Sequence, residues 1–440
     1  MNRRSFIRKA SLATAGTLAL PYILPSGSLF AKTGARRVNK VVFCFFAGGV
    51  RVLDSVQKAE GNLMPCTFYG NEAISGSIAH SMTPLPNSPL SQPLQAYGTL
   101  YKQFVLRQGA TGHFPGHVTG LTGRYTDNSL NYRGHPPYPT VFEYYLKHNS
   151  PQKTPLNAWW ISNSMGAFSL MNYSAHPDYG TAYAANHLSP GNLINRQQSA
   201  LIGNTIERMH ERELKINQMR EVLNKNFNRN DLVRPGLMQN DDDRQKLQLF
   251  LNDIYGRFDR GELWNPWGIG AGYDWDSMAV FYAEELMRRF QPELTVVNLQ
   301  GVDVCHTNFT GYCDAMRRND YAIAHLWHTI QTTPGMMDDT VMIITSEHGR
   351  NAEPNTIIDS NGRRAIDHTD DDMARRIFCL IVGPPHVIKQ NQVIEDAGRD
   401  GGRKAFELTD VVPTIAHVLG FDTAIGGGIL TGSPLYEAFV

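Results

Sequence analysis

The sequence predicts an α/β fold: a mostly parallel central sheet with helices on both faces, plus a helical insertion. Short, continuously apolar segments alternate along the chain with longer segments of helical apolar spacing, which is the pattern of a covered parallel sheet. The chain has 440 residues, of which 42% are hydrophobic, so it is long enough to bury a full-sized core. Only 19% of the residues are charged, which excludes a disordered chain for most of its length.

Strands are expected where apolar runs meet glycine-rich turns. Val38–Phe46 is rich in β-branched and aromatic residues and ends at Ala47-Gly48-Gly49, so it predicts a buried strand that runs into a turn. Phe104–Arg107 predicts a second strand, after which residues 109–112 form a Gly-rich turn before a helix-compatible segment. Further apolar runs predict strands at 159–162, 294–299, 340–345 and 377–382.

Helices are expected between these strands. Thr409 is expected to cap the last of them, which ends at Gly420 and has Pro413 near its first turn. Apolar residues on one helical face predict earlier helices at 140–148, 277–290 and 321–331.

One charged region predicts an insertion. Residues 198–226 carry apolar residues at helical spacing and predict a long surface helix, with a second helix at about 243–258. We therefore expect one domain over residues 38–440 with a helical insertion at about 196–260. The helix at 198–226 is either a solvated insertion or a docking surface for a partner in a surface or export complex.

The first 31 residues have the pattern of an export signal. Arg3, Arg4 and Phe6 form a basic start, which is followed by an apolar stretch and by small residues that end near Ala31. The paired arginines with Phe6 resemble a bacterial twin-arginine signal. This predicts recognition by the twin-arginine export machinery and a periplasmic or secreted mature protein; the alternative is a basic helix packed on the domain.

Charge and hydropathy argue against two kinds of partner. Lys and Arg total 41, as do Asp and Glu, whereas a nucleic-acid-binding protein normally has a basic excess. Beyond the N-terminal region no uninterrupted apolar run reaches the roughly 18 residues of a membrane span, so we expect none in the mature chain. Cys44 and Cys379 lie in expected strands and are core candidates, and export would permit a bridge between Cys305 and Cys313.

Three polar clusters lie near the expected strands, and together they predict a metal site. Asp303 and His306 follow one strand, Glu347 and His348 follow another, and His368 lies shortly before a third. Polar residues just beyond the carboxyl ends of strands are the usual site-forming residues in such sheets. Mixed histidine and carboxylate ligands suit Zn²⁺ or a similar transition metal better than Ca²⁺, which prefers oxygen alone.

The number of candidate ligands favours two ions. We expect one ion on Asp303, His306 and His368, and a second on Glu347 and His348. Two ions about 4 Å apart can bind the attacking and leaving oxygens of a phosphoryl or sulfuryl transfer. The segment from Thr111 to Tyr125 supports this, because a turn before a helix places free N–H groups where an anion binds.

Several motifs resemble those of the alkaline phosphatase superfamily. Leu121-Thr122-Gly123-Arg124-Tyr125 resembles the Leu-Thr-Gly-Arg that follows Cys/Ser-x-Pro-x-Arg in sulfatases. His113-Phe114-Pro115-Gly116-His117 is similar to the Thr-Phe-Pro-Asn-His stretch of nucleotide pyrophosphatase/phosphodiesterases. Ser346-Glu347-His348-Gly349 resembles the superfamily's Ser-Asp-His-Gly, and residues 408–415 resemble the Asp-x-x-Pro-Thr helix of sulfatase-like chains. With the twin-arginine start, the set looks most like the bacterial family called domain of unknown function 1501.

The resemblance implies a superfamily fold and metal ligands over nearly all of residues 38–440, but the chain departs from the pattern at three places. The family nucleophile falls at His113, Glu347 stands for the usual Asp, and the Asp expected directly after the first strand is replaced by Ala47-Gly48-Gly49. The nearest acid is Asp54, several residues later, which the resemblance makes a further candidate ligand of the second ion. His113 is then a metal ligand or a nucleophile that forms a phospho-imidazole, and Thr111 is the second candidate nucleophile.

The leading hypothesis is an exported, metal-dependent hydrolase of small-molecule or polymer phosphate or sulfate esters, with two ions and Zn²⁺ favoured. The alternative is a non-catalytic metal- or anion-binding member of the same fold that has lost the nucleophile. A helix N-terminus and nearby divalent cations both disfavour a proton, so the hydrolase hypothesis expects His113 to be neutral. Arg124 and Arg350 are either structural or anion-facing.

Overall fold

The structure is a computed structural model. It describes residues 22–23, 29–30 and 35–440, apart from 128–131, 133, 150–154, 163–169, 190–240, 264, 271–273, 370, 400–403 and 426–428. The expected helix at 198–226 therefore lies outside the described residues. So does the expected export signal, except for Tyr22–Ile23 (β1) and Leu29–Phe30 (β2), which pair antiparallel.

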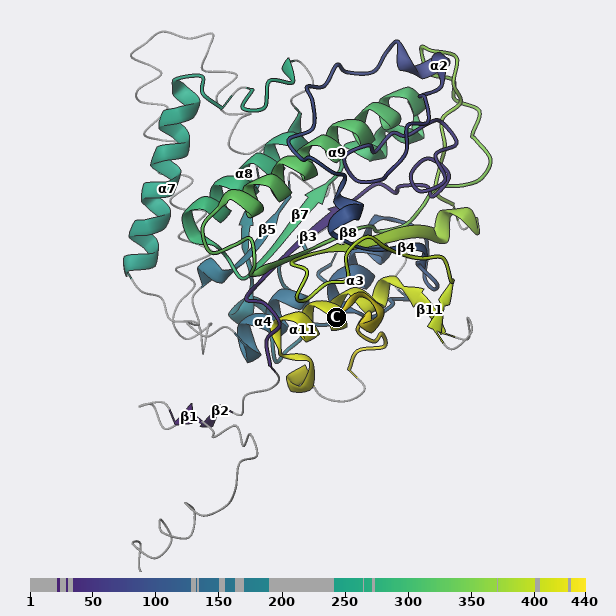
Figure 1. Cartoon of the computed structure of the whole chain (residues 1–440). Coiled ribbons are helices and arrows are strands. Elements are labelled where there is room, and N and C mark those ends of the chain that lie inside the picture. Colours follow the sequence, from purple (N-terminus) through teal and green to yellow (C-terminus); the bar gives the residue numbers. More distant parts are fainter. Residues whose placement is uncertain are drawn as a thin grey trace, which may run out of the picture.

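Nine strands of the described residues form one central sheet (Figure 1). The order is β10-β4-β9-β8-β3-β7-β5-β6, with β11 beside β4. β9 runs antiparallel to β4 and β8, and the other neighbouring pairs are parallel, so the mostly parallel sheet is confirmed. The strands are β3 (Lys40–Phe46), β4 (Gly98–Val105), β5 (Ala158–Ile161), β6 (Asn186–Leu188), β7 (Leu294–Leu299), β8 (Thr340–Ser346), β9 (Arg376–Val382), β10 (Gln392–Ile394) and β11 (Lys404–Glu407).

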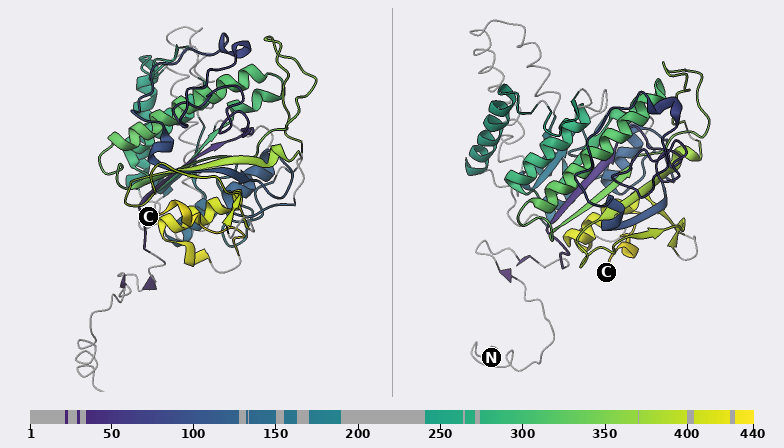
Figure 2. Two further views of the ribbon diagram at one scale, coloured as in Figure 1. Left: turned by 45° about the vertical axis from the view of Figure 1, so that its right-hand side comes forward. Right: turned by 45° about the horizontal axis from the view of Figure 1, so that its top comes forward.

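Helices cover both faces of the sheet, as the views in Figure 2 show. Alternate residues of β3 point to opposite faces, so Cys44 and Phe46 join one hydrophobic cluster while Phe43 and Phe45 join the other. The first cluster lies under α7 (Asp241–Asp259), α8 (Trp275–Phe290) and α9 (Phe309–Thr332). The second lies under α3 (His113–Thr122), α4 (Val141–His148) and α11 (Val411–Leu419). A short helix, α2 (Gly76–Ala79), lies outside these layers.

Local capping explains where several helices begin. Thr140 and Glu143 form a capping box at the start of α4, in which each side chain bonds the other's backbone N–H. Asn308 accepts from the Gly311 N–H and starts α9, twelve residues before the predicted helix at 321–331. Asp410, not the predicted Thr409, stands at the N-cap of α11, whereas Gly420 ends that helix as expected in the left-handed region.

Two further expectations need correction. The strand β4 spans Gly98–Val105 instead of the predicted 104–107. Its polar residues Lys102 and Gln103 lie where the pairing of β4 with β9 shifts in register, and they interrupt the apolar run of β4. All five cysteines are buried free thiols, so Cys305 and Cys313 form no bridge.

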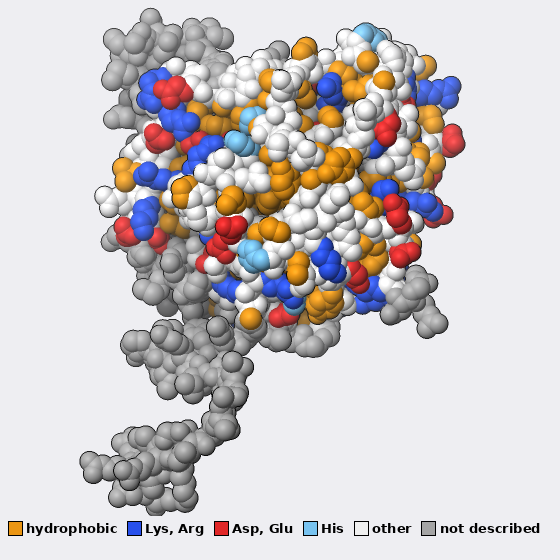
Figure 3. Space-filling view, viewed as in Figure 1, with side chains coloured by type: hydrophobic (Ala, Val, Ile, Leu, Met, Phe, Trp, Pro, Cys, Tyr) orange, Lys and Arg blue, Asp and Glu red, His pale blue; other side chains and the backbone are white. Residues whose placement is uncertain are grey.

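The arrangement of strands decides where a site can form. β8, β3 and β7 are neighbours and parallel, so their carboxyl ends meet at one edge of the sheet. Among the described residues no helix is both long and apolar enough to cross a membrane. On the face shown in Figure 3, basic and acidic side chains are interspersed.

Candidate metal centre

Three loops that follow neighbouring strands meet around one buried cation, Arg350. Its guanidinium is fully buried and donates to the backbone carbonyls of Gly48, Gly49, Val302 and Ile366. It also donates to Asp303 Oδ1 at 3.0 Å. Arg350 is therefore structural, because its N–H groups are used to hold the loops after β3, β7 and β8 together. Arg124 is structural too: it donates to the Ile429 carbonyl and lies over the Tyr138 ring.

The missing Asp after the first strand has a steric explanation. Gly48 and Gly49 have φ values of +128° and +80°, which side chains rarely adopt. A Cβ atom on Gly48 would lie 2.6 Å from the Asp303 nitrogen. Instead of supplying a carboxylate, this turn supplies a donor: the Gly48 N–H bonds Glu347 Oε1 at 2.6 Å.

We predict that Gly49→Ala destabilises the protein by about 1–3 kcal/mol, the usual cost of overpacking. Its Cβ would meet Gly349 O and His348 Nδ1, each at 2.6 Å, and neither can withdraw without moving a candidate ligand. Chemical denaturation of the variant and the parent measures the effect. Gly362→Ala is the matched control, since φ is +77° there but no atom lies within 4 Å of the added Cβ. Equal losses in the two variants would attribute the effect to backbone strain alone.

The structure brings most of the predicted ligands together in two groups. One contains His113, Asp303 and His368, and the other contains His113, Glu347 and His348; ligand atoms within each group lie within 4.8 Å of one another. His113 belongs to both groups because its two ring nitrogens face different carboxylates. Nδ1 lies 2.8 Å from Glu347 Oε1, and Nε2 lies 3.4 Å from Asp303 Oδ2.

Two imidazoles, the buried ring of His348 and the half-buried ring of His368, are oriented as metal ligands. His348 Nδ1 faces the Gly349 carbonyl and His368 Nδ1 faces the Thr111 carbonyl, both at 2.7 Å, so each Nδ1 carries the hydrogen. Burial lowers the pKa of His348, and it lowers the pKa of His368 to about 2, so both rings are neutral and Nε2 keeps a lone pair. Both Nε2 atoms are buried without a hydrogen-bond partner, and that of His348 lies 3.2 Å from Glu347 Oε1. A cation would bind these two unpartnered lone pairs together with the carboxylates of Glu347 and Asp303, which belong to the same groups, so the residues fit a metal ion.

His306 reaches the centre by a different route. It lies outside both groups of candidate ligands, although its Nε2 is 3.4 Å from Asp303 Oδ1 and its ring centroid is 4.6 Å from that of His368. Its Nδ1 lies 2.6 Å from Asp367 Oδ1, and Asn355 donates to the other oxygen of Asp367. A carboxylate behind a histidine is the usual support of a metal-bound imidazole.

The charges of the protein alone act against the expected neutral His113. Burial lowers the pKa of this imidazole, but the carboxylates of Glu347 and Asp303 outweigh it and raise the pKa to about 10. Burial also raises the pKa of Glu347, yet the surrounding histidines hold that pKa well below its ordinary value. Only divalent cations beside Glu347 and Asp303 would reverse the balance at His113.

Two predicted site residues have other contacts. Both oxygens of Asp54 accept from the Arg51 guanidinium at 2.8 Å, and Asp54 is in neither group of candidate ligands. The Thr111 hydroxyl donates to the His368 carbonyl at 2.8 Å and is 2% exposed, so it helps to hold His368. These contacts favour a structural role for both residues. The geometry does not support Asp54 as a metal ligand or Thr111 as a nucleophile.

Sequence reasoning missed three residues around the ligands: His117, Asp367 and Asn355. His117 stands one helical turn after His113, a spacing that places both on one face of α3. Asp367 directly precedes the candidate ligand His368, but its contact with His306 could not be predicted, because the two residues are 61 positions apart in the chain. No local pattern identifies Asn355.

The fold and site define an α/β protein with histidines and carboxylates gathered at the carboxyl ends of its strands. No protein-family model matches the chain, and no curated protein matches its sequence. Its solved structural likenesses include a protein in the alkaline phosphatase superfamily from Vibrio parahaemolyticus, at 12% identity and a TM-score of 0.44 over 100% of this chain and 80% of that one.

Two further solved structures are similar. Phosphonate monoester hydrolase SpPMH from Silicibacter pomeroyi has 13% identity and a TM-score of 0.46, over 91% of this chain and 76% of that one. BT1596, a 2-O GAG sulfatase, has 9% identity and a TM-score of 0.47, over 91% of this chain and 74% of that one. All of these TM-scores lie below 0.5, and the likeness assigns no activity to this chain. The narrower resemblance to domain of unknown function 1501 has no matching family model and stays a prediction.

Proposed function

We propose that this chain is an exported, metal-dependent hydrolase of phosphate or sulfate esters. The observation that carries the proposal is the pair of neutral imidazoles of His348 and His368, whose buried Nε2 atoms make no hydrogen bond and whose rings belong to the two groups that contain Glu347 and Asp303. Asp303, His306 and His368 would hold one cation, and Glu347 and His348 a second, with His113 between them. The mixed nitrogen and oxygen donors favour Zn²⁺. Such cations supply Lewis-acid stabilisation of the charge on the ester oxygens.

The position of helix α3 supports an anionic substrate. The helix begins at His113, directly after its N-cap residue Gly112. The positive end of the helix dipole therefore lies at His113, where it favours an anion. Small-molecule and polymer esters both carry such a group, so we propose them as the substrate class.

The second candidate function is a non-catalytic metal- or anion-binding protein of the same fold. The contacts of His113 favour it, because both ring nitrogens face carboxylates where the resemblance expects a nucleophile. The hydroxyl of Thr111, the other candidate nucleophile, is already used in a bond to the His368 carbonyl.

Two measurements test the proposal. The first is hydrolysis of aryl phosphate monoesters, phosphate diesters and sulfate esters by protein purified without chelator, with and without later chelation. The second is the metal content of the same protein. Chelator-sensitive turnover with about two ions per chain supports the hydrolase. Bound metal without turnover supports the binding protein, and a metal-free protein without turnover contradicts both the hydrolase and the metal-binding function.

We also predict that Arg3→Lys combined with Arg4→Lys will leave the precursor in the cytoplasm. The reason is that the paired arginines are the part of the signal that a twin-arginine receptor reads. Cell fractionation with an antibody against the chain measures the distribution. Arg8→Lys is the matched control, because it makes the same charge-preserving change outside the arginine pair. Normal periplasmic accumulation of the double variant would contradict twin-arginine export.

A further inference from the structure

A buried polar chain runs beneath the candidate metal centre and passes through His117. This residue lies on α3 and is 1% exposed. Its Nδ1 lies 2.7 Å from the His113 carbonyl and 2.5 Å from Glu347 Oε2. The hydrogen of Nδ1 is donated to the His113 carbonyl, and the otherwise unpartnered Glu347 Oε2 lies against the same nitrogen without a hydrogen bond of its own.

The other end of the ring is anchored in the sheet. Nε2 of His117 lies 2.9 Å from Asn298 Oδ1, and Asn298 Nδ2 donates to the Ser162 hydroxyl at 3.3 Å. Asn298 belongs to β7, and Ser162 directly follows β5. The chain therefore connects the carboxylate of Glu347 to two strands that contribute no carboxylate ligand of their own to that group.

The packing leaves the His117 ring little freedom to turn. Its edge or face contacts Phe45 and Trp160, with ring centroids at 5.2 and 6.1 Å. The helix also approaches Glu347 closely, since a Cβ atom on Gly116 would lie 2.8 Å from Glu347 Cβ. The close approach at Gly116 is what brings His117 within reach of the carboxylate.

The two oxygens of Glu347 have different partners. Oε1 accepts from the Gly48 N–H and lies near His113 Nδ1 and His348 Nε2, whereas Oε2 lies against His117. We propose that His117 is a positioning residue that holds Glu347 Oε2, so that Oε1 is turned toward the cation group of His113, Glu347 and His348. This inference rests on the proposed metal binding, and it predicts an effect on one cation group and not on the other.

The test is metal affinity measured without turnover. Metal-stripped parent, His117→Phe and His117→Gln are titrated with Zn²⁺ against a chromophoric chelator, and with Co²⁺ for the absorption spectrum of each site. Loss of a residue that supports a ligand typically weakens metal binding about 10- to 100-fold. We expect a loss of that size for one of two ions in His117→Phe, and a smaller loss in His117→Gln, whose amide keeps a polar N–H group beside Glu347 Oε2.

The control is Thr119→Val on the same helix. Its buried hydroxyl donates to the Pro115 carbonyl at 2.8 Å and touches no candidate ligand, so its removal should leave both affinities unchanged. If His117→Phe does not fold, Asn298→Ala, which removes only the partner of Nε2, replaces it with a smaller expected loss at the same ion.

Three outcomes would overturn the inference. The first is a metal affinity equal to the parent's in His117→Phe, or in Asn298→Ala where it replaces that variant. The second is an equal loss of affinity at both ions, and the third is a loss in Thr119→Val as large as that in His117→Phe. A parent that binds no divalent ion would overturn the proposed metal binding together with the inference.

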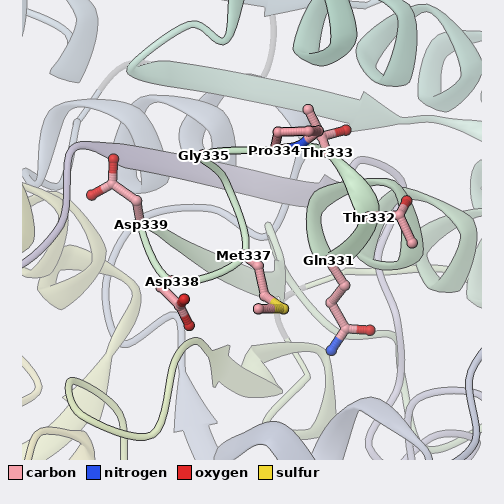
Figure 4. A pocket seen from close by; sticks show the side chains of 8 residues that line it. All are labelled: Gln331, Thr332, Thr333, Pro334, Gly335, Met337, Asp338 and Asp339. Carbon is pink, nitrogen blue, oxygen red and sulfur yellow. The ribbon is translucent and has the colours of Figure 1, made fainter.

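A surface pocket of about 250 Å³ at residues 331–339 lies at the opposite end of β8 and has no part in this site (Figure 4).

Discussion

His348→Ala and Asp303→Ala will each lower bound metal and thermal stability together. A metal ion that binds the native state alone stabilises it by RT ln(1 + [L]/Kd), which is about 4 kcal/mol at a thousandfold excess over Kd. His348 contributes a buried lone pair from one cation group, and Asp303 contributes a carboxylate from the other. Each variant should therefore lose most of this gain for its own ion and melt below the metal-loaded parent.

Metal content and melting curves of the purified variants, with and without added Zn²⁺, measure the two effects. The parent treated with chelator is the reference, because it should melt close to the variants if the metal accounts for the difference. Asp359→Asn is a control carboxylate, since Asp359 accepts backbone N–H groups of its own loop and of Thr310 and belongs to neither cation group. If His348→Ala and Asp303→Ala retain the parent's metal and melt with it, the centre is misplaced.

Substitution of His113 will decide between hydrolase and binding protein. If the chain is a hydrolase, His113→Ala should abolish activity, because loss of one transition-state interaction costs about 3–4 kcal/mol, or roughly a hundred- to a thousandfold in rate. His113→Thr restores the residue type at the nucleophile position of the phosphodiesterase motif that this segment resembles, and it should preserve or raise phosphodiesterase activity.

The contacts of His113 make this test sharper. The carboxylates of Glu347 and Asp303 favour the protonated ring, which can neither ligate metal nor attack phosphorus, so activity requires cations to displace that proton. Rates on phosphate monoesters, diesters and sulfate esters, each measured with added Zn²⁺, give the answer. Should the parent and both variants be equally inert while they still bind metal, the non-catalytic function stands.

Much of the fold and of the ligand set could be predicted because the signals are local. The strand β3 is an uninterrupted apolar run closed by glycines, and Glu347 with His348 follows the end of a similar run. Parallel order then brings such strand ends together, which explains why Asp303 and His368, far apart in the chain, lie in one group of candidate ligands.

The remaining features depend on contacts between distant segments. Asp54 was predicted to be a metal ligand because the sequence does not show that Arg51 forms a buried ion pair with it. The support of His306 by Asp367 and of Glu347 by His117 joins loops and helices whose approach no periodicity records. The start of β4 was missed because its polar residues sit at an irregular register against β9.

The reversed direction of β9 determines where the chain can accept insertions close to the candidate ligands. Parallel neighbours must be joined by a crossover that returns to the other end of the sheet, but β8 and β9 are antiparallel and are joined at one end. The connection from Glu347 to Arg375 therefore begins and ends at the rim that carries the ligands, and it delivers His368 to them. Lengthening such a connection costs only about 0.6 kcal/mol per doubling. Insertion here would therefore change the surface beside the candidate ligands while the sheet and its register stay intact.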